Sequence, residues 1–269
     1  MTLRADCVNI VPPVLLPLVP KRFDVIGDIA VLSLPYPLLP YACVIARTIT
    51  TRRKTVRTVV RKVTKVDGYH RVAGFEVITG NSTVTICREN GFSYRVDLTD
   101  VFFAPRLASE RKRVTSLVQA DERVLVPFAG AGPFVVPAAA NGGLVTAIEM
   151  NPVAFRCLEE NVVANGVAGR TALIRGDAFD RSLLQEEGFD RAIIPAPYSK
   201  DGILWSLAPA IRSGGIIHIY TFRKKNEIPG LIAEYQSRKL SVVTYRRCGN
   251  VAPDVSRWVF DLCRDRAAL

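Results

Sequence analysis

Short segments of alternating or β-branched apolar residues dominate the first hundred residues of the chain. Turn signals separate them, at Asp67-Gly68, Gly80-Asn81 and Asn90-Gly91. Alternation of this kind between such turns is typical of strands. The pattern therefore predicts a small mixed or mostly antiparallel, β-rich domain over residues 1–106, with strands within residues 25–34, 55–66, 75–80, 82–90 and 92–103.

The pattern changes after residue 106. Residues 107–118 are charged and helical in character, and we expect them to form a helical connector. Beyond it, apolar runs alternate with helical stretches, which predicts βαβ units and a parallel sheet covered on both faces. The expected strands lie within residues 123–130, 144–150, 171–177, 189–197 and 216–222, and the expected helices within residues 133–141, 152–166 and 202–215.

Two strand-like stretches end the chain, residues 240–249 and 256–265, and residues 250–255 between them predict a hairpin. A parallel sheet that finishes in an antiparallel hairpin is the arrangement associated with class I S-adenosylmethionine-dependent methyltransferases. We therefore predict an α/β, Rossmann-like domain of that class over residues 107–269, preceded by the β-rich domain.

The charge balance is the unusual part of the composition. The chain has 36 Lys and Arg against 25 Asp and Glu, a formal net charge of +11, while its 49% hydrophobic content excludes general disorder. This balance favours a nucleic acid, an anionic membrane or a polyanionic substrate as partner, with a merely solvated basic surface as the alternative.

The cysteines and the N-terminus bear on the cellular compartment. The six cysteines form no C-x-x-C pair and there are two histidines, so we predict neither a metal site nor a disulfide framework. Four prolines interrupt the apolar residues 8–20, and no run reaches the ~20 apolar residues of a membrane span. We expect a cytoplasmic protein that does not enter a membrane.

Residues at the ends of three predicted strands indicate a nucleoside cofactor. Gly130 and Gly132 follow the first strand of the second domain and would let the backbone approach a ligand. Glu149 ends the next strand, where a carboxylate can accept hydrogen bonds from ribose hydroxyls. Asp177 ends the third, where it could bind an adenine amino group. The alternative is an ordinary strand–helix turn with solvated acids.

The form of the glycine loop favours S-adenosylmethionine over NAD, because the third glycine of a dinucleotide fingerprint is absent and there is no phosphate to bind. The residues predicted to bind S-adenosylmethionine are Phe128, Ala129, Gly130, Gly132, Pro133, Phe134, Glu149, Met150, Asn151, Asp177, Ala178 and Pro195.

Five segments together resemble one family. Residues 23–32, 88–97, 101–114, 127–134 and 147–154 are similar, in that order, to archaeal and eukaryotic tRNA guanine-N1 methyltransferases, which modify the guanine 3′ of the anticodon (position 37). The most specific parts are A-P-R-L-x-x-E-R at 104–111 and F-A-G-x-G-P-F at 128–134. The tRNA aminocarboxypropyl transferases of wyosine synthesis are also similar, and the G-P-F form of the loop favours the methyltransferase branch.

The resemblance implies two catalytic residues. Guanine N1 carries a proton near neutral pH, so its methylation needs a base, and a donor near O6 to stabilise the developing charge. The family resemblance places the base at Glu110 and the cation at Arg71, with His70 and Arg88 as alternatives to Arg71. The alternative for Glu110 is an exposed helix carboxylate that pairs with Arg111 or Arg113.

The chain departs from the family pattern at two places. Val126-Pro127 stands where the family usually has Asp, and residues 195–198, Pro-Ala-Pro-Tyr, replace an Asn-x-Pro target-base loop. Tyr198 could still supply a stacking surface for the base. These departures keep a further alternative open, an RNA-binding protein with a degraded methyltransferase site.

A run of basic residues predicts an RNA-binding surface. Residues 51–65 carry seven Lys and Arg with no acid among them, and we expect no carboxylates nearby, which favours contacts to phosphates that position an RNA. The connector could extend this surface toward the cofactor. The predicted RNA-binding residues are Arg52, Arg53, Lys54, Arg57, Arg61, Lys62, Arg106, Arg111 and Tyr198.

The expected partner is the anticodon stem-loop of tRNA, and we expect a monomer. Many members of the similar family carry a further N-terminal domain. Because the similar residues already begin at Phe23, we expect that domain to be absent.

Overall fold

The computed structural model describes residues 2–63, 74–184, 188–252 and 254–265. The chain divides into two compact units, Met1–Pro105 and Arg106–Leu269. Each unit has its own hydrophobic core and is described by itself below. No helix in the described ranges is both long and apolar enough to cross a membrane.

The first unit contains a four-stranded sheet in the order β1-β2-β3-β4. β2 and β3 are parallel, whereas β1–β2 and β3–β4 are antiparallel, so the expectation of a small mixed β-rich domain is confirmed. β5 and β6 form a separate antiparallel hairpin. Its turn is Asn90-Gly91, and both residues have positive φ, as a type I′ hairpin turn requires. The strands are β1 (Asp24–Ile26), β2 (Ile29–Leu32), β3 (Thr58–Lys62), β4 (Phe75–Thr79), β5 (Val84–Glu89) and β6 (Phe92–Asp97).

The parallel pairing of β2 with β3 needs a crossover, and a helix that the sequence pattern did not predict supplies it. This helix, α2 (Ala42–Arg52), buries Ile45, Ala46 and Ile49 in the core of the first unit. Its β-branched residues have modest helix propensity, so burial decides the conformation. The remaining helical elements of this unit are α1 (Leu3–Asp6), η1 (Leu16–Leu18) and η2 (Tyr36–Tyr41).

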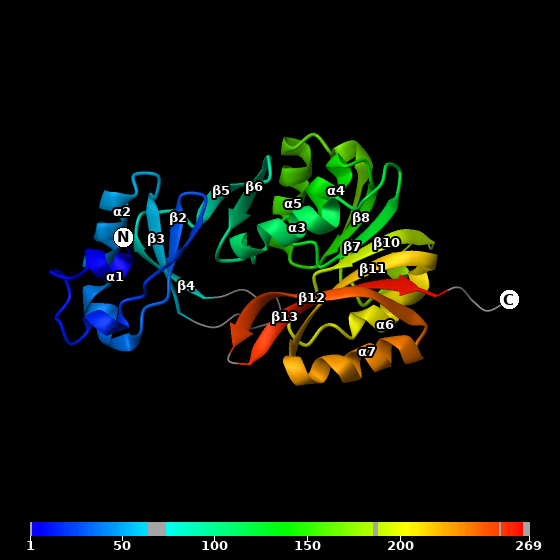
Figure 1. Ribbon diagram of the computed structural model, residues 1–269. Helices are drawn as coiled ribbons and strands as arrows, with labels where there is room; N and C mark the ends of the chain where they lie inside the picture. Colours follow the sequence, from blue (N-terminus) through cyan, green and yellow to red (C-terminus); the bar gives the residue numbers. More distant parts are fainter. Residues whose placement is uncertain (1, 64–73, 185–187, 253, 266–269) are drawn as a thin grey trace. The chain divides into compact units, whose positions relative to one another are not determined.

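The second unit is built on a seven-stranded sheet in the order β12-β13-β11-β10-β7-β8-β9 (Figure 1). β7 to β11 are parallel, and β13 lies antiparallel between β11 and β12. The predicted class I methyltransferase fold with its terminal hairpin is thus confirmed. The strands are β7 (Arg123–Pro127), β8 (Leu144–Glu149), β9 (Thr171–Arg175), β10 (Phe189–Ile194), β11 (Ile211–Lys224), β12 (Leu240–Ala252) and β13 (Val255–Arg264).

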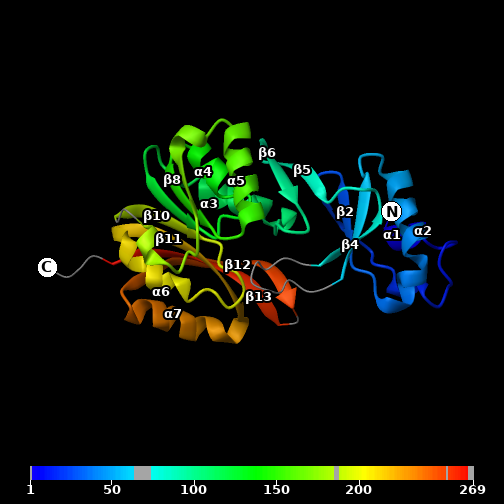
Figure 2. The same ribbon diagram turned by 180° about the vertical axis from the view of Figure 1, so that it is seen from behind.

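Helices cover both faces of this sheet. Figures 1 and 2 show α3, α4 and α5 on one side, and α6 and α7 on the other. The central strands are therefore apolar on both faces, with Leu125, Ile194 and Ile217 fully buried. The helices are α3 (Ala108–Thr115), α4 (Val135–Ala140), α5 (Pro152–Ala164), α6 (Ile203–Leu207) and α7 (Ile228–Ser237), with short 3-10 turns η3 (Pro105–Leu107), η4 (Ala168–Arg170), η5 (Arg181–Leu183), η6 (Ala208–Ala210) and η7 (Lys225–Glu227).

One predicted helix is shorter than expected. Residues 202–215 read as a single helix, but α6 ends at Leu207, η6 follows, and β11 already begins at Ile211. Pro209 lacks the N–H that a continuing helix needs. The sequence IRSGG at 211–215 therefore belongs to the strand, and that part of the prediction was wrong.

The strand order fixes where a ligand can bind. The chain runs outward from β7 through β8 to β9, and then returns to the other side of β7 with β10. At such a reversal the loops after neighbouring strands diverge, which opens a crevice at the carboxyl ends of the strands. The loops after β7, β8, β9 and β10 all meet at this edge.

Candidate active site

The loop after β7 has the backbone geometry of a ligand cradle. Phe128, Gly130 and Gly132 all have positive φ, at 54°, 56° and 90°. A Cβ on Gly130 would meet no atom within 4 Å, so the backbone faces open space there. A Cβ on Gly132 would lie 2.7 Å from Leu158 Cδ1, so this glycine lets α5 pack closely against the loop. The first glycine can thus admit a ligand, while the second serves packing.

Glu149 joins the loops after β7 and β8. Its Oε2 accepts a hydrogen bond from the Gly130 N–H at 2.8 Å, and its Oε1 accepts one from the Asn151 N–H at 2.7 Å. Asn151 in turn caps α5, because its Oδ1 accepts the N–H of Val153 at 2.9 Å. A carboxylate at this position is an acceptor for hydrogen bonds, the chemistry that ribose hydroxyls require.

The third strand tip lies next to the other two. The Gly176 N–H donates to the Glu149 carbonyl at 3.0 Å, which places the residues after β9 beside the end of β8. Asp177 is exposed there, and its Oδ1 accepts the Phe179 N–H at 3.0 Å. The Phe179 ring lies 6.2 Å from that of Phe128. The structure therefore brings together the three tips that the sequence singled out.

The other predicted cofactor-binding residues lie on the same loops. Ala129 is fixed by a hydrogen bond from its N–H to the Ile148 carbonyl at 3.0 Å. Phe134 is buried at the start of α4, and Pro195 directly follows β10. Pro133 and Met150 are half-buried, and Ala178 is buried. The set fits an adenosine-containing cofactor, because open backbone, an accepting carboxylate and an exposed acid line one edge.

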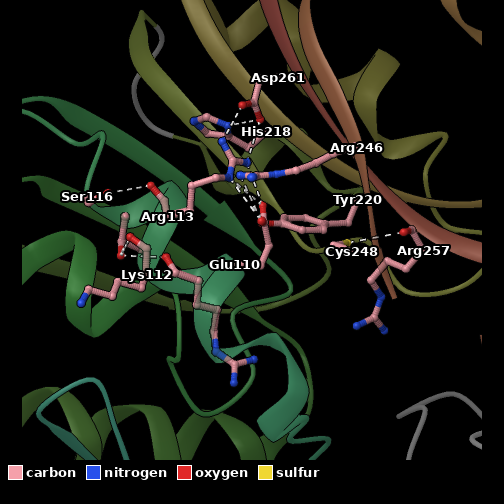
Figure 3. A network of polar contacts seen from close by, with 12 residues as sticks. Glu110, Lys112, Arg113, Ser116, His218, Tyr220, Arg246, Cys248, Arg257 and Asp261 are labelled. Atoms are coloured by element: carbon pink, nitrogen blue, oxygen red, sulfur yellow. Dashed lines mark hydrogen bonds and ion pairs between the residues drawn. The ribbon is translucent and has the colours of Figure 1, made fainter. Parts of the chain in front are cut away.

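Glu110 lies on α3 and is 9% exposed. The alternative described an exposed helix carboxylate, and that part of it is wrong. Its expected pairing with Arg113 is present: Arg113 Nη2 donates to Oε1 at 2.7 Å and Nε donates to Oε2 at 3.2 Å. The two residues are three apart on one helix, the spacing that brings side chains together. Figure 3 shows this pair at the centre of a larger polar network.

The network continues from Arg113 into the sheet. Arg113 Nη1 donates to Asp261 Oδ2 at 2.6 Å, and Asp261 Oδ1 lies 2.7 Å from His218 Nδ1. Burial alone would raise the pKa of Asp261, but hydrogen bonds from His218 and Arg113 lower it to about 2. Arg191 Nη1 lies 2.7 Å from His218 Nε2, and Arg191 pairs with Glu122 at 3.0 Å. From Glu110 to Glu122, carboxylates and guanidinium groups therefore alternate along the network, with His218 between Asp261 and Arg191.

Tyr220 connects Glu110 to the glycine loop. Its hydroxyl donates to Glu110 Oε1 at 3.1 Å, and its ring centroid lies 5.5 Å from that of Phe134. Burial, with the Glu110 carboxylate as a further cause, raises the pKa of Tyr220 well above 10. The phenol therefore stays protonated and remains a donor. One side chain thus separates the predicted base from the predicted cofactor loop.

The hydrogen-bond partners of His218 determine its protonation state. Arg191 can only donate, so Nε2 must accept, and the proton of the neutral ring sits on Nδ1 and donates to Asp261. Burial lowers the pKa of His218 below 6.5; the Asp261 carboxylate opposes this shift and the Arg191 and Arg113 cations add to it. The folded unit therefore holds His218 neutral.

We expect the second unit to lose stability as the pH falls below about 6.5. The unfolded chain protonates its histidine there while the folded chain does not, so the stabilisation is complete above the unfolded pKa and is lost toward the lower folded one. One proton contributes at most about 1.4 kcal/mol per pH unit. Urea unfolding at pH 7.5 and 5.5 measures the slope, and both tryptophans, Trp205 and Trp258, report on this unit.

The matched variants for this prediction replace each histidine in turn. His218→Gln keeps a donor and an acceptor but does not titrate, so its stability should vary less between the two pH values. His70→Gln removes the other histidine of the chain and should retain the wild-type slope. Equal slopes for wild type and His218→Gln would contradict the assignment.

The basic run in the first unit has acidic neighbours that the sequence alone did not reveal. Arg52 pairs with Asp6 at 2.6 Å, Arg57 Nε lies 4.0 Å from Asp28, and Arg61 pairs with Glu76. Tertiary contacts therefore bring carboxylates to a stretch that has none in sequence, and the expectation of a run without nearby acids was wrong. Lys54 is exposed and Lys62 is half-buried.

A cavity of about 590 Å³ in the first unit adds basic residues to this surface. Arg52 and Arg53 line it together with Lys21, Arg22 and Phe23. The Arg53 guanidinium lies 5.1 Å from the centre of the Phe23 ring. Two of the predicted RNA-binding residues thus share a cationic cavity with residues that sequence reasoning had not selected.

The remaining predicted residues differ in accessibility. Arg106 is exposed, as the prediction requires, whereas Arg111 is 3% exposed and so does not extend an exposed basic surface as expected. Tyr198 is exposed, and its ring lies 5.4 Å from that of Phe222. Arg71 and the competing His70 lie outside the described residues. Arg88, the other competitor, is exposed on β5.

Sequence reasoning missed most of the network around Glu110. Tyr220 and His218 lie in β11, Asp261 in β13, and Arg246 in β12. A usable signal existed, because polar residues inside otherwise apolar strands are buried and must find partners. Nothing in the local pattern, however, indicated that those partners would come from α3.

Comparisons with known proteins agree with this geometry. A family model described as the TRM5/TYW2 methyltransferase domain matches residues 85–242, and one described as the TYW2 N-terminal domain matches residues 6–83. A relative named tRNA (guanine(37)-N(1))-methyltransferase Trm5b, from Pyrococcus abyssi, is 42% identical over 127 residues, which are 47% of this chain and 38% of that protein. The chain thus matches well under half the length of this curated relative.

Solved structures match over more of the chain. The crystal structure of Pyrococcus abyssi Trm5b superposes with a TM-score of 0.85 at 35% identity, over 95% of this chain and 78% of that one. The complex of aTrm5 with tRNALeu gives 0.89 at 25% identity, over 98% and 78%. TYW2 of P. horikoshii in complex with MeSAdo gives 0.79 at 28% identity, over 97% of each chain.

Proposed function

Because the chain belongs to the TRM5/TYW2 methyltransferase domain family, we propose that it is an S-adenosylmethionine-dependent tRNA methyltransferase that methylates N1 of guanine 37. The observation that carries this proposal is the placement of Glu110. Its carboxylate is buried, and Tyr220 contacts both this carboxylate and Phe134 of the glycine loop. Methylation of guanine N1 needs a base beside the cofactor, and this arrangement supplies one.

Each part of the site has a role in this reaction. The loop from Phe128 to Phe134 and the Glu149 carboxylate hold the adenosine portion of S-adenosylmethionine, which supplies an electrophilic methyl group when bound. Asp177 is exposed where it can accept from the adenine amino group. Glu110 accepts the N1 proton of guanine, and Arg113 and Tyr220 hold its carboxylate in place.

The proposed partner is tRNA, contacted at its anticodon stem-loop by a monomer of this protein. The basic residues of the first unit support this proposal, because Lys and Arg that contact phosphates position an RNA without reading its sequence. Arg71 remains the family-based candidate for a donor to O6. No disulfide joins the six cysteines, all of which lie within the described residues, and this supports a reducing compartment such as the cytoplasm.

The direct test is mass spectrometry of tRNA nucleosides after incubation with the protein and S-adenosylmethionine. We expect 1-methylguanosine at the nucleotide 3′ of the anticodon, and none when adenosine replaces that guanosine. Unmodified tRNA in the presence of cofactor that calorimetry shows to be bound would overturn the proposal.

The TYW2-type match of residues 6–83 favours a second candidate, transfer of the aminocarboxypropyl group of the same cofactor to a wyosine precursor. Label in the cofactor's methyl group reaches the RNA only in methylation, whereas label in its carboxyl group reaches the RNA only in aminocarboxypropyl transfer. The two labels, used in parallel on one tRNA preparation, separate the candidates.

A further inference from the structure

The two oxygens of the Glu110 carboxylate have different surroundings. Oε1 accepts from Arg113 Nη2 at 2.7 Å, from Arg113 Nε at 3.1 Å and from the Tyr220 hydroxyl at 3.1 Å. Oε2 accepts from Arg113 Nε at 3.2 Å, and Arg246 Nη2 lies 3.2 Å from it. Oε2 therefore has fewer and longer protein contacts than Oε1, and it is the oxygen next to Arg246. We take Oε2 as the oxygen that receives the substrate proton.

Arg246 differs from Arg113 in its setting. Arg113 lies between two carboxylates, Glu110 and Asp261, and hydrogen bonds to Asp261 and Glu110 raise its pKa against the effect of burial. Arg246 extends from the edge strand β12 toward Glu110 (Figure 3), and its side chain is 45% exposed. A guanidinium carries five N–H groups, so one that reaches Oε2 from the solvent side still has donors to offer a ligand.

An accepting oxygen beside a cationic donor matches one kind of base edge. Guanine presents N1–H next to the O6 acceptor, so Glu110 Oε2 can receive the proton while Arg246 donates to O6. Adenine presents the reverse pattern at these positions, an acceptor at N1 and a donor at C6. The negative charge that develops on O6 as N1 loses its proton would then lie against a fixed cation.

We propose that Arg246 is a catalytic residue of the methyl transfer, which donates to guanine O6 beside Glu110 and selects guanine over adenine. This assignment rests on the proposed function. Arg246 comes from the terminal hairpin. Its contact is compatible with the one that the family resemblance offers for Arg71, because a carbonyl oxygen such as O6 has two acceptor lone pairs. The hairpin of the second unit thereby contributes directly to the reacting base.

The test is single-turnover methylation of tRNA by the full chain at saturating S-adenosylmethionine. Arg246→Ala should lower the rate constant by about tenfold to hundredfold, with little change in tRNA affinity. Arg247→Ala is the matched control, since this residue is the next on β12, is exposed and projects to the opposite face of the strand. It should keep the wild-type rate. Guanidinium chloride at tens of millimolar should restore Arg246→Ala.

A second measurement distinguishes contact with O6 from indirect support of Glu110. In tRNA with 6-thioguanosine at the target, sulfur replaces the acceptor, and the change in rate should be smaller for Arg246→Ala than for wild type. If the effects of 6-thioguanosine and of Arg246→Ala on the rate constant are fully additive in free energy, Arg246 does not contact O6. Wild-type methylation with an equally active Arg246→Ala would overturn this assignment alone, whereas an inactive wild type would overturn the proposed function and the assignment with it.

Discussion

Glu110→Gln should slow single-turnover methyl transfer by about 10²–10⁴-fold, the range typical of a lost general base. The amide is neutral and cannot take up the N1 proton of guanine. It retains the shape of the side chain and an oxygen that can accept from Tyr220, while Arg113 keeps its second partner, Asp261. Affinities for S-adenosylmethionine and tRNA should therefore stay close to those of the wild type.

Asp190→Asn is the matched control for this prediction. Asp190 is also a carboxylate held by an arginine, Arg212, but it lies at the start of β10, the end of the strand opposite the cofactor loop, and outside the network around Glu110. Its replacement should reduce stability and leave the rate of methyl transfer unchanged. A Glu110→Gln enzyme within threefold of the wild-type rate would remove the base role from Glu110.

Glu149→Ala should abolish measurable binding of S-adenosylmethionine, a loss of at least about 100-fold in affinity. The change removes the acceptor for the ribose hydroxyls and also leaves the N–H groups of Gly130 and Asn151 without their partner. A buried N–H such as that of Asn151 costs about 1–3 kcal/mol when it loses its partner, so the loop should lose its shape as well as one contact. Isothermal titration calorimetry measures the affinity.

Two further variants make this result interpretable. Glu159→Ala removes an exposed carboxylate from α5 and should bind the cofactor as the wild type does. Glu149→Gln keeps the volume of the side chain but offers one accepting oxygen, so we expect an intermediate affinity. Wild-type affinity in a folded Glu149→Gln protein would show that this side chain does not hold the cofactor.

The strongest local patterns predicted the architecture well. Apolar runs of strand length, separated by helical stretches, gave the parallel strands β7 to β11, and the last two stretches gave the hairpin of β12 and β13. These patterns are reliable because strands buried on both faces must be apolar along their length. The helix α2 was not predicted, because its residues have weak helix propensity. Its helical conformation is decided by the burial of one face in the core.

The residues of the candidate site that could be predicted are those whose position depends on nearby residues in the sequence. Gly130, Glu149 and Asp177 were found because each follows or ends a strand, and parallel strands align their carboxyl ends at one edge. Arg111 was placed on an exposed surface because it is charged, yet the fold buries it. A charged residue in a helix gives no local sign of which face will be covered.

The sequence by itself determined the parallel strands, the terminal hairpin, the glycine loop and the acids at the strand tips, because all of these depend on residues close together in the chain. Only the tertiary structure decided the surroundings of Glu110. Arg113 meets Asp261 across 148 positions of sequence, and Tyr220 meets Glu110 across 110. Such contacts depend on how β11, β12 and β13 lie against α3, and packing between distant segments leaves no periodicity in the sequence for a reader to detect.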